Sequence, residues 1–472
     1  MFVKQIYTSC LSEASYFIES EGEAAVIDPI RESDVYLELA KERGATIRYI
    51  FETHFHADFI SGHLELAEHT GAAIVFGPGA QTGYRSYTAK DQEVFSLGML
   101  TLVALHTPGH TPESTSFLLK DKNSKNYAIF TGDTLFVGDV GRPDLAVKST
   151  LTEKDLAGML YDSIHEKIMP LEDDVLVYPS HGPGSACGKN IGKETWSTIG
   201  QQRKTNYALQ PISRDKFIEI LTEGIIPAPE YFSIAANINK SGYLSLENII
   251  SRALKPLNFD ELKYLIDSGC QIIDTRNPDD FERGFIGSSI NIGLNGQFAI
   301  WAGTLLDYFT PTVLVCEPGK EREAMVRLAR VGFENVVGYL DEGIDGWKNA
   351  GGRIQSIASA EPSDMKGYID QGYEILDVRK PGEFEIGHIK GAVNIHLQIL
   401  DKELNQLDKN KNYLIHCAGG YRSMIACSIM KKHGFRNTIN IYRGFNGILE
   451  SAGLEIETGT CENTRRMQKL QA

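Results

Sequence analysis

The amino-acid sequence predicts a multidomain α/β protein. Its 472 residues exceed what one hydrophobic core of roughly 250–300 residues accommodates, so roughly two to four domains are expected. Short β-branched runs bounded by Gly and Pro alternate with helical patterns along the chain, which is typical of α/β domains. A hydrophobic fraction of 42% and a charged fraction of 23% are those of an ordinary globular protein.

An internal repeat divides the second half of the chain. The segment IIDTRNPDDFERGFIGSSINI (272–292) matches ILDVRKPGEFEIGHIKGAVNI (375–395) in its Asp, Arg, Pro and Phe-Glu positions. A repeat of about 100 residues is too long for a solenoid unit, so each copy should have its own core. We predict domains at 1–240, 256–355 and 362–460, with a parallel sheet flanked by helices in each copy.

The N-terminal domain has potential metal ligands where its predicted strands end. Apolar runs such as IRYIFETH, LTLVALHTPGH, NYAIFTGD and DVLVYPSHG predict a mixed, sheet-rich α/β domain. Four of these runs end in, or are followed at once by, His54, His110, Asp133 and His181. We therefore expect these side chains to gather at one place.

The motifs THFHAD (53–58), TPGHTPES (107–114), TGDTLF (131–136) and PSHG (179–182) resemble the motif series of the metallo-β-lactamase fold. GDTLFVGDVGRPDL (132–145) is similar to the glyoxalase II and persulfide dioxygenase branch. With the two repeats, the chain resembles bacterial persulfide dioxygenases fused to tandem rhodanese domains. The resemblance implies an N-terminal αββα sandwich followed by two rhodanese-like α/β domains.

One position departs from the binuclear members of this family. They read His-x-His-x-Asp-His, whereas Phe59 stands at the final position here, and phenylalanine cannot bind a metal. The resemblance then implies one Fe(II) per chain, with zinc possible in purified protein. The implied ligands are His54, His110 and Asp133, and the implied neighbours, acting on the ligands or as possible ligands, are His56, Asp58 and His181.

This ligand set suits oxygen chemistry independently of the resemblance. Two imidazoles and one carboxylate on one face of a metal leave positions open for substrate and O₂. A structural zinc site would favour four ligands with cysteines, and these motifs contain no cysteine.

A second reactive centre is predicted in HCAGGYRSMIACSIMKKHG (416–434), which matches the rhodanese active-site loop Cys-x4-Arg. Cys417 follows an apolar strand, and backbone N–H groups at the start of the next helix would stabilise its thiolate and a bound sulfane sulfur. Arg422 would attract sulfite or thiosulfate. The cradle of the persulfide should consist of Ala418, Gly419, Gly420 and Tyr421.

The first copy has a degenerate loop, VCEPGKEREAM (315–325). Cys316 and Arg322 have the longer spacing of phosphatase relatives, but Pro318 lacks an amide donor and two glutamates add negative charge. We interpret this copy as a packing and spacing domain. In both copies the repeated Asp and Arg, Asp274 with Arg276 and Asp377 with Arg379, should form an internal ion pair.

Two residues near the metal motifs each have two possible roles that the sequence does not separate. Cys187, six residues after His181, is expected at the mouth of the metal pocket, as a thiol that relays a persulfide or as a packing residue. Arg142 either recognises the thiol carrier, as a substrate-binding residue, or braces the loop after Asp133 together with Asp144.

Composition limits the partners and the location. A formal charge of −15 argues against nucleic acid. No apolar run reaches the ~20 residues that span a bilayer, and the start of the chain lacks a signal-peptide pattern, so a cytoplasmic protein is expected. Seven scattered cysteines indicate reduced thiols, and no role is expected for Cys10, Cys270, Cys427 and Cys461.

The expected function is sulfide detoxification. The iron site would oxidise a persulfide of glutathione or coenzyme A type with O₂ to sulfite and thiol, and the rhodanese site would form or use thiosulfate through a Cys417 persulfide. The alternatives are a zinc-dependent thioester hydrolase of the glyoxalase II type and a sulfur-carrier scaffold without activity. Look-alikes of this domain commonly self-associate, so a homo-oligomer is expected.

Overall fold

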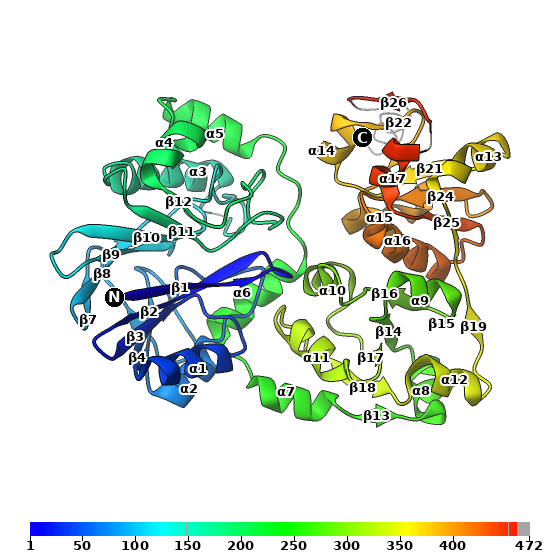
Figure 1. The fold of residues 1–472 in the computed structure, drawn as a ribbon, viewed down its shortest axis with the longest axis horizontal. Helices are drawn as coiled ribbons and strands as arrows, with labels where there is room; N and C mark the ends of the chain where they lie inside the picture. Colours follow the sequence, from blue (N-terminus) through cyan, green and yellow to red (C-terminus); the bar gives the residue numbers. More distant parts are fainter. Residues whose placement is uncertain (148–149, 452, 460–472) are drawn as a thin grey trace. The chain divides into compact units, whose positions relative to one another are not determined.

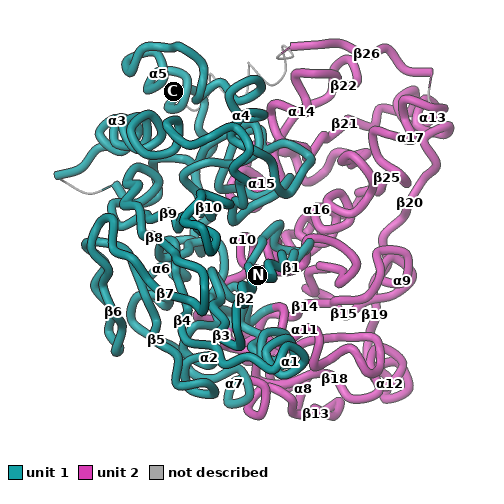
Figure 2. The backbone as a smooth tube through the Cα atoms, turned by 60° about the vertical axis from the view of Figure 1, so that its left-hand side comes forward, with its two compact units in different colours: residues 1–249, 328–333 teal, residues 250–327, 334–472 magenta. Residues whose placement is uncertain are grey.

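The computed structural model describes residues 1–147, 150–451 and 453–459 and divides the chain into two compact units. Unit 1 comprises residues 1–249 and 328–333, and unit 2 comprises residues 250–327 and 334–472 (Figure 2). Cys461 and the end of the third predicted domain lie outside the described residues.

Unit 1 contains two six-stranded mixed sheets. The first has the order β1-β2-β3-β4-β5-β6, formed by Phe2–Thr8, Glu13–Ser20, Glu23–Ile27, Thr46–Phe51, Ala73–Phe76 and Tyr87–Thr88. The second has the order β12-β11-β10-β9-β8-β7, formed by Ser197–Thr198, Leu176–Pro179, Asn126–Gly132, Thr115–Lys120, Leu100–His106 and Val94–Leu97.

The two sheets pack face to face and helices cover their outer faces (Figure 1). Strand β2 shows why, since Tyr16 and Ile18 join the core between the sheets while Phe17 joins the core under the helices. The first sheet is covered by α1 (Asp34–Arg43) and α2 (His63–Thr70). Covering the second are α3 (Glu153–Ser163), a π-helical turn (Ile164–Ile168), α4 (Ile199–Thr205), a 3₁₀ turn (Tyr207–Leu209) and α5 (Arg214–Thr222). The predicted αββα sandwich is confirmed.

Unit 2 contains the two repeats, each built on a five-stranded parallel sheet. The first has the order β13-β18-β17-β14-β16, from Pro256–Leu257, Val336–Leu340, Thr312–Val315, Gln271–Asp274 and Ser289–Asn291. The second has the order β20-β25-β24-β21-β23, from Ala358–Ala360, Thr438–Ile441, Tyr413–His416, Glu374–Asp377 and Val393–Asn394. The equal strand orders confirm two copies of one parallel α/β fold.

Each copy adds helices and a small two-stranded sheet to its core. In the first copy these are α8 (Phe259–Asp267), α9 (Pro278–Arg283), α10 (Phe298–Leu305), α11 (Glu321–Ala329) and α12 (Gly343–Asn349), with β15 (Phe285–Ile286) and β19 (Ile354–Gln355). In the second they are α13 (Met365–Asp370), α14 (Pro381–Ile386), α15 (Leu397–Glu403), α16 (Tyr421–Lys432) and α17 (Gly444–Ser451), with β22 (His388–Ile389) and β26 (Ile456–Glu457). Short 3₁₀ turns lie at Pro362–Asp364 and Leu404–Gln406. In the chain, α6 (Tyr231–Ser241) and α7 (Leu246–Ala253) follow the sandwich and precede the first repeat.

The repeated Asp and Arg form the predicted internal ion pairs. Arg276 donates to both carboxylate oxygens of Asp274 and to the carbonyl of Gly284, and Arg379 does the same with Asp377 and Gly387. Both pairs are buried, so each ties the end of a central strand to the loop that follows the next helix. None of the described helices combines the length and apolarity that crossing a membrane requires.

Candidate metal centre and sulfur-transfer loop

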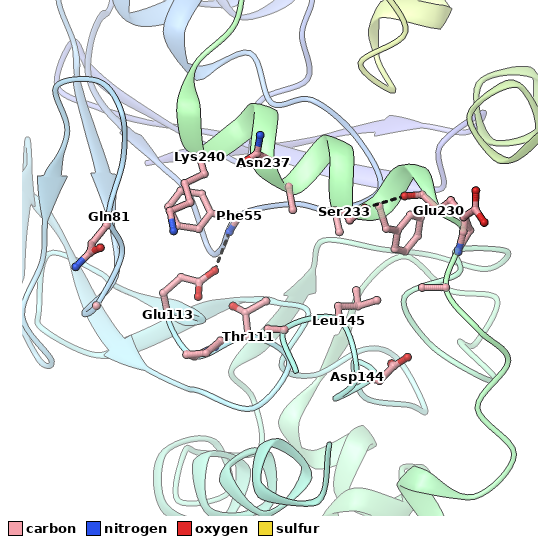
Figure 3. A pocket seen from close by; sticks show the side chains of 18 residues that line it. Phe55, Gln81, Thr111, Glu113, Asp144, Leu145, Glu230, Ser233, Asn237 and Lys240 are labelled. Atoms are coloured by element: carbon pink, nitrogen blue, oxygen red, sulfur yellow. Dashed lines mark hydrogen bonds between the residues drawn. The ribbon is translucent and has the colours of Figure 1, made fainter. Parts of the chain in front are cut away.

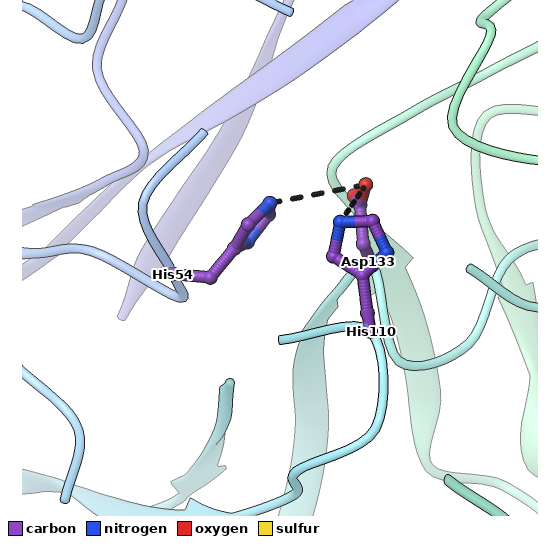
Figure 4. A group of neighbouring side chains, drawn as sticks. All are labelled: His54, His110 and Asp133. Carbon is purple, nitrogen blue, oxygen red and sulfur yellow. Dashed lines mark ion pairs between the residues drawn. The ribbon is translucent and has the colours of Figure 1, made fainter. Parts of the chain in front are cut away.

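Three strand ends of unit 1 bring His54, His110 and Asp133 together. They follow β4, β8 and β10, and their ligand atoms all lie within 4.8 Å of one another. The Oδ2 atom of Asp133 is 3.3 Å from Nε2 of His110 and 3.9 Å from Nε2 of His54 (Figure 4). Gly132 permits this approach, because its φ is +54° and a Cβ atom there would lie 2.7 Å from Thr53.

Hydrogen bonds orient both imidazoles with Nε2 directed toward the cluster. Nδ1 of His110 donates to the carbonyl of Arg142 at 2.8 Å, and Nδ1 of His54 lies 3.0 Å from Oγ1 of Thr53. The Thr53 hydroxyl donates to Asp28, so it accepts the proton of His54. Both rings therefore carry their proton on Nδ1 and have an Nε2 lone pair available, as metal-binding histidines do.

The converging atoms have no hydrogen-bond partner among the described residues. Nε2 of His54 and of His110 and both carboxylate oxygens of Asp133 are buried without a hydrogen bond. Such groups are costly to bury uncompensated, and a bound cation would satisfy them. Burial and the neighbouring imidazoles hold the pKa of His54 well below its ordinary value, which favours the neutral form that binds a metal. These residues fit a metal ion.

The neighbouring group, His56, Asp58 and His181, could also hold a metal ion by its geometry. Nε2 of His181 lies 3.4 Å from Oδ2 of Asp58 and 3.4 Å from Oδ1 of Asp133. His56, however, directs its Nε2 at Oδ1 of Asp28, 3.1 Å away. Its ring also packs on fully buried Phe59, with the ring centroids 4.4 Å apart.

The buried carboxylates around His56 were missed by the sequence reasoning. Asp28 accepts from the backbone N–H and the hydroxyl of Thr53 and from Ser180, while Glu52 lies 3.6 Å from Nε2 of His56. Burial alone would lower the pKa of His56, but these carboxylates raise it to about 10. A signal did exist, since Asp28 directly follows the apolar run EAAVI, as Asp133 follows its own strand.

Cys187 lies deeper than the predicted pocket mouth. It is buried, and its sulfur forms a compact group with ligand atoms of Asp133 and His181. Its carbonyl accepts from the backbone N–H of Arg142, which draws its segment onto the loop after Asp133. Burial, and then the carboxylates of Asp58 and Asp133, raise the pKa of the Cys187 thiol well above its ordinary value.

The guanidinium of Arg142 is occupied by protein groups. It makes two hydrogen bonds to the carboxylate of Asp144, at 2.6 and 2.7 Å, and donates to the carbonyls of Ala186 and Ile226. These contacts favour the bracing role over recognition of a thiol carrier. The backbone carbonyl of the same residue orients His110.

A cavity of about 640 Å³ lies beside the cluster (Figure 3). Its wall includes Phe55, which follows His54, and Thr111, which follows His110. The remaining lining residues mix apolar and polar side chains: Ala57, Gly79, Gln81, Pro112, Glu113, Asp144, Leu145, Ala146, Ala228, Pro229, Glu230, Phe232, Ser233, Ala236, Asn237 and Lys240. The cavity has the size of a small-molecule site.

In unit 2 the Cys417 loop has the geometry of an anion cradle. Gly420 has a φ of +102°, and its N–H donates to the Cys417 sulfur at 3.1 Å, immediately before α16 begins at Tyr421. Ala418 and Gly419 complete the turn. The Gly420 N–H and the start of α16 therefore both lie at the sulfur, an arrangement suited to holding an anionic group there.

Arg422 makes two hydrogen bonds to Glu383, at 2.6 and 2.8 Å, a partner that the sequence reasoning did not identify. Burial would raise the pKa of Glu383, but the guanidinium lowers it to about 2. The charge of Arg422 is therefore partly offset before any substrate arrives.

The equivalent Cys316 has a different environment. It directly follows β17 and is buried; burial, with the charges of Glu321, Asp274 and Glu317, raises the pKa of its thiol to about 12. With a pKa raised this far, the thiol is protonated at neutral pH.

Comparison with known proteins assigns both halves of the chain. Residues 9–181 match the model of the metallo-β-lactamase superfamily. Over 225 residues the chain is 30% identical to the mitochondrial persulfide dioxygenase ETHE1 of Homo sapiens, covering 46% of this chain and 78% of that protein. The chain belongs to the metallo-β-lactamase superfamily. Residues 258–350 and 361–451 match the rhodanese-like domain, so a sandwich with persulfide dioxygenase relatives is fused to two rhodanese-like domains, as the motifs indicated.

Two further matches show which other kinds of protein the chain resembles. The crystal structure of a metallo-β-lactamase from Staphylococcus aureus is 32% identical, has a TM-score of 0.64, and covers 72% of this chain and 98% of its own. Hydroxyacylglutathione hydrolase GloC of Haemophilus influenzae is 26% identical over 221 residues, which cover 42% of this chain and 93% of that protein. Relatives of the domain therefore include both oxidising and hydrolysing enzymes.

Proposed function

We propose that this protein oxidises a low-molecular-weight thiol persulfide to sulfite and thiol at one Fe(II), and that its second rhodanese-like domain transfers sulfur through Cys417. The observation that carries the proposal is the buried, unsatisfied set of His54, His110 and Asp133 in a domain similar to a persulfide dioxygenase. Fe(II) bound there would supply adjacent open positions for the persulfide and O₂.

The chain's own residues hold and orient this site. Thr53 and the Arg142 carbonyl set the two imidazole rings, and Asp133 brings negative charge between them. The cavity lined by Phe55 and Thr111 would receive the thiol carrier, of glutathione or coenzyme A type. The burial of His54, His110 and Asp133 would keep bulk water from the reacting sulfur.

A single metal ion is favoured over two. Phe59 stands where binuclear family members have a ligand of the second metal, and Nε2 of His56 is directed at the carboxylate of Asp28. His56, Asp58 and His181 then act as neighbours that orient ligands or move protons.

The competing function is zinc-dependent thioester hydrolysis, which the hydroxyacylglutathione hydrolase relatives favour. It would need a metal-activated water in place of O₂. Metal analysis of protein purified without added metal, combined with oxygen uptake on glutathione persulfide and on coenzyme A persulfide, separates the two. Zinc at full occupancy with thioester cleavage and no oxygen uptake would overturn the dioxygenase proposal.

The ligand assignment has its own test. Replacing Asp133 by Ala should abolish iron binding and oxygen uptake, because it removes the carboxylate that faces both imidazoles. His56→Ala should retain iron in part but lose turnover. Iron at full occupancy in Asp133→Ala would contradict the assignment.

At the second centre, the Cys417 thiolate attacks the outer sulfur of thiosulfate. A Cys417–sulfur bond forms, the sulfur–sulfur bond of thiosulfate breaks, and sulfite leaves with the electron pair. The reverse step lets sulfite take the outer sulfur of a Cys417 persulfide and leave as thiosulfate. The reverse direction would link the two centres, since sulfite is the product of the first.

Cys187 is proposed to hold or relay a persulfide beside the metal, because its sulfur groups with Asp133 and His181. Cys187→Ser should slow oxygen uptake while iron content and sulfur transfer at Cys417 stay unchanged. An unchanged oxygen-uptake rate would make Cys187 a packing residue. Cys187 and Cys417 must both stay reduced for these roles, which supports a cytoplasmic location. We also propose that the protein forms a homo-oligomer, which light scattering would test.

A further inference from the structure

The first rhodanese-like copy contacts the sulfur-transfer loop of the second. Tyr421 is the first residue of α16, and its hydroxyl donates to the carbonyl of Gly293 at 2.7 Å. Gly293 follows β16 of the first copy. The residue that begins the cradle helix is therefore held by the domain that lacks a working loop.

Gly296 fits this contact closely. A Cβ atom there would lie 2.5, 2.5 and 2.9 Å from three atoms of the Tyr421 ring, which are its nearest neighbours. The backbone of Gly296 does not have the positive φ that would itself require glycine. The missing side chain is thus explained by the tyrosine ring of the other copy, 125 residues further along the chain.

A second contact lies on the same face of α16. The backbone N–H of Asn291 donates to Oγ of Ser428 at 3.1 Å. Ser428 is seven residues after Tyr421, about two helical turns, so both side chains point to one face. Asn291 is itself anchored, because its amide donates to the carbonyls of Asp274 and Arg276 at the end of β14.

We infer that the 291–296 segment of the first copy is a positioning element for the Cys417 cradle. The Gly420 N–H, at the start of α16, stabilises the sulfur only when it points at it, and both contacts set the position of that helix relative to Cys417. This gives the degenerate copy a role in sulfur transfer without a reactive cysteine of its own. The inference rests on the proposed role of Cys417 as a sulfur acceptor.

The test follows the loading of Cys417 by thiosulfate in the full-length protein, observed as the mass gain of one sulfur atom in single-turnover experiments. Gly296→Ala pushes on the ring, and Tyr421→Phe removes only the hydrogen bond to Gly293. Each should lower the loading rate at saturating thiosulfate by about threefold to tenfold, the factor that one lost neutral hydrogen bond corresponds to. The thiosulfate concentration for half-maximal rate and oxygen uptake should stay unchanged.

Two controls separate positioning from general damage. Gly367→Ala, where a Cβ meets nothing within 4 Å, should load at the wild-type rate. In a Tyr421→Ala background, Gly296→Ala should have no further effect, because the ring that it would strike is gone. If Gly296→Ala fails to fold, Tyr421→Phe alone decides.

Loading of Gly296→Ala and Tyr421→Phe at the wild-type rate would overturn the inference while leaving the proposed function intact. Failure of the wild-type protein to load at all would instead refute the proposed role of Cys417, so the two failures are distinguishable.

Discussion

Cys417 and Cys316 follow equivalent strands, β24 and β17, in two copies of one fold, and both are buried. The Cys417 sulfur accepts a backbone N–H from Gly420 at the start of a helix. Burial, joined by the charges of nearby carboxylates, raises the pKa of the Cys316 thiol to about 12. The shared sheet therefore positions both cysteines alike, and the loop amide and the local charges distinguish Cys417, the sulfur acceptor that we propose, from Cys316.

Replacing each of the two cysteines by serine should give the largest difference between the two copies. Cys417→Ser should abolish thiosulfate formation, because sulfite then has no persulfide to attack, while oxygen uptake persists and sulfite accumulates. Cys316→Ser should leave the ratio of sulfite to thiosulfate unchanged. Chromatography of both anions measures this, and the opposite result would place the active loop in the first copy.

The buried Asp–Arg ion pair is a feature that the two copies share, so removing it should affect both copies alike. Asp377→Asn and Asp274→Asn each leave a buried arginine without its carboxylate, which typically costs about 3–5 kcal/mol. We expect comparable losses of thermal stability for the two variants in unit 2, measured by scanning calorimetry. A large loss in one and none in the other would show that the copies are supported differently.

The partner of Arg422 distinguishes the copies again. Glu383→Gln leaves Arg422 unpaired, so unit 2 should melt at a lower temperature at pH 7; Asp280→Asn, at the equivalent exposed position, should change little. The folded-state pKa of Glu383 is lowered, so its stabilisation is full above about pH 4.5 and is lost as the pH falls toward about 2. The gap between wild type and Glu383→Gln should close in that range, as melting curves at several pH values would show.

The smallest expected effect concerns the charges around Cys316. Glu321→Gln should lower the pKa of that thiol slightly and raise its alkylation rate at pH 8 by about twofold, more than Glu317→Gln, because Glu321 acts more strongly on it. Peptide mass spectrometry after timed alkylation would resolve the two. Equal rates in both variants and the wild type would assign the raised pKa to burial alone.

Much of the fold was predictable from local patterns. The 103-residue offset predicted two equal domains, and apolar runs ending in His or Asp predicted which side chains meet, because the ends of neighbouring strands lie together. Cys187 was placed too far out, since loop path depends on contacts such as that of its carbonyl with the Arg142 N–H.

The sequence by itself therefore determined the domain repeat, the residues of the candidate metal cluster and the contrast between the two cysteine loops. These features are carried by periodicity, spacing and residue type, which are local. Only the tertiary structure decided that Asp28 engages His56, that Glu383 engages Arg422, and that Gly296 borders Tyr421. Such pairs join distant segments through packing, and no local pattern specifies which partner a buried charge or a small residue will meet.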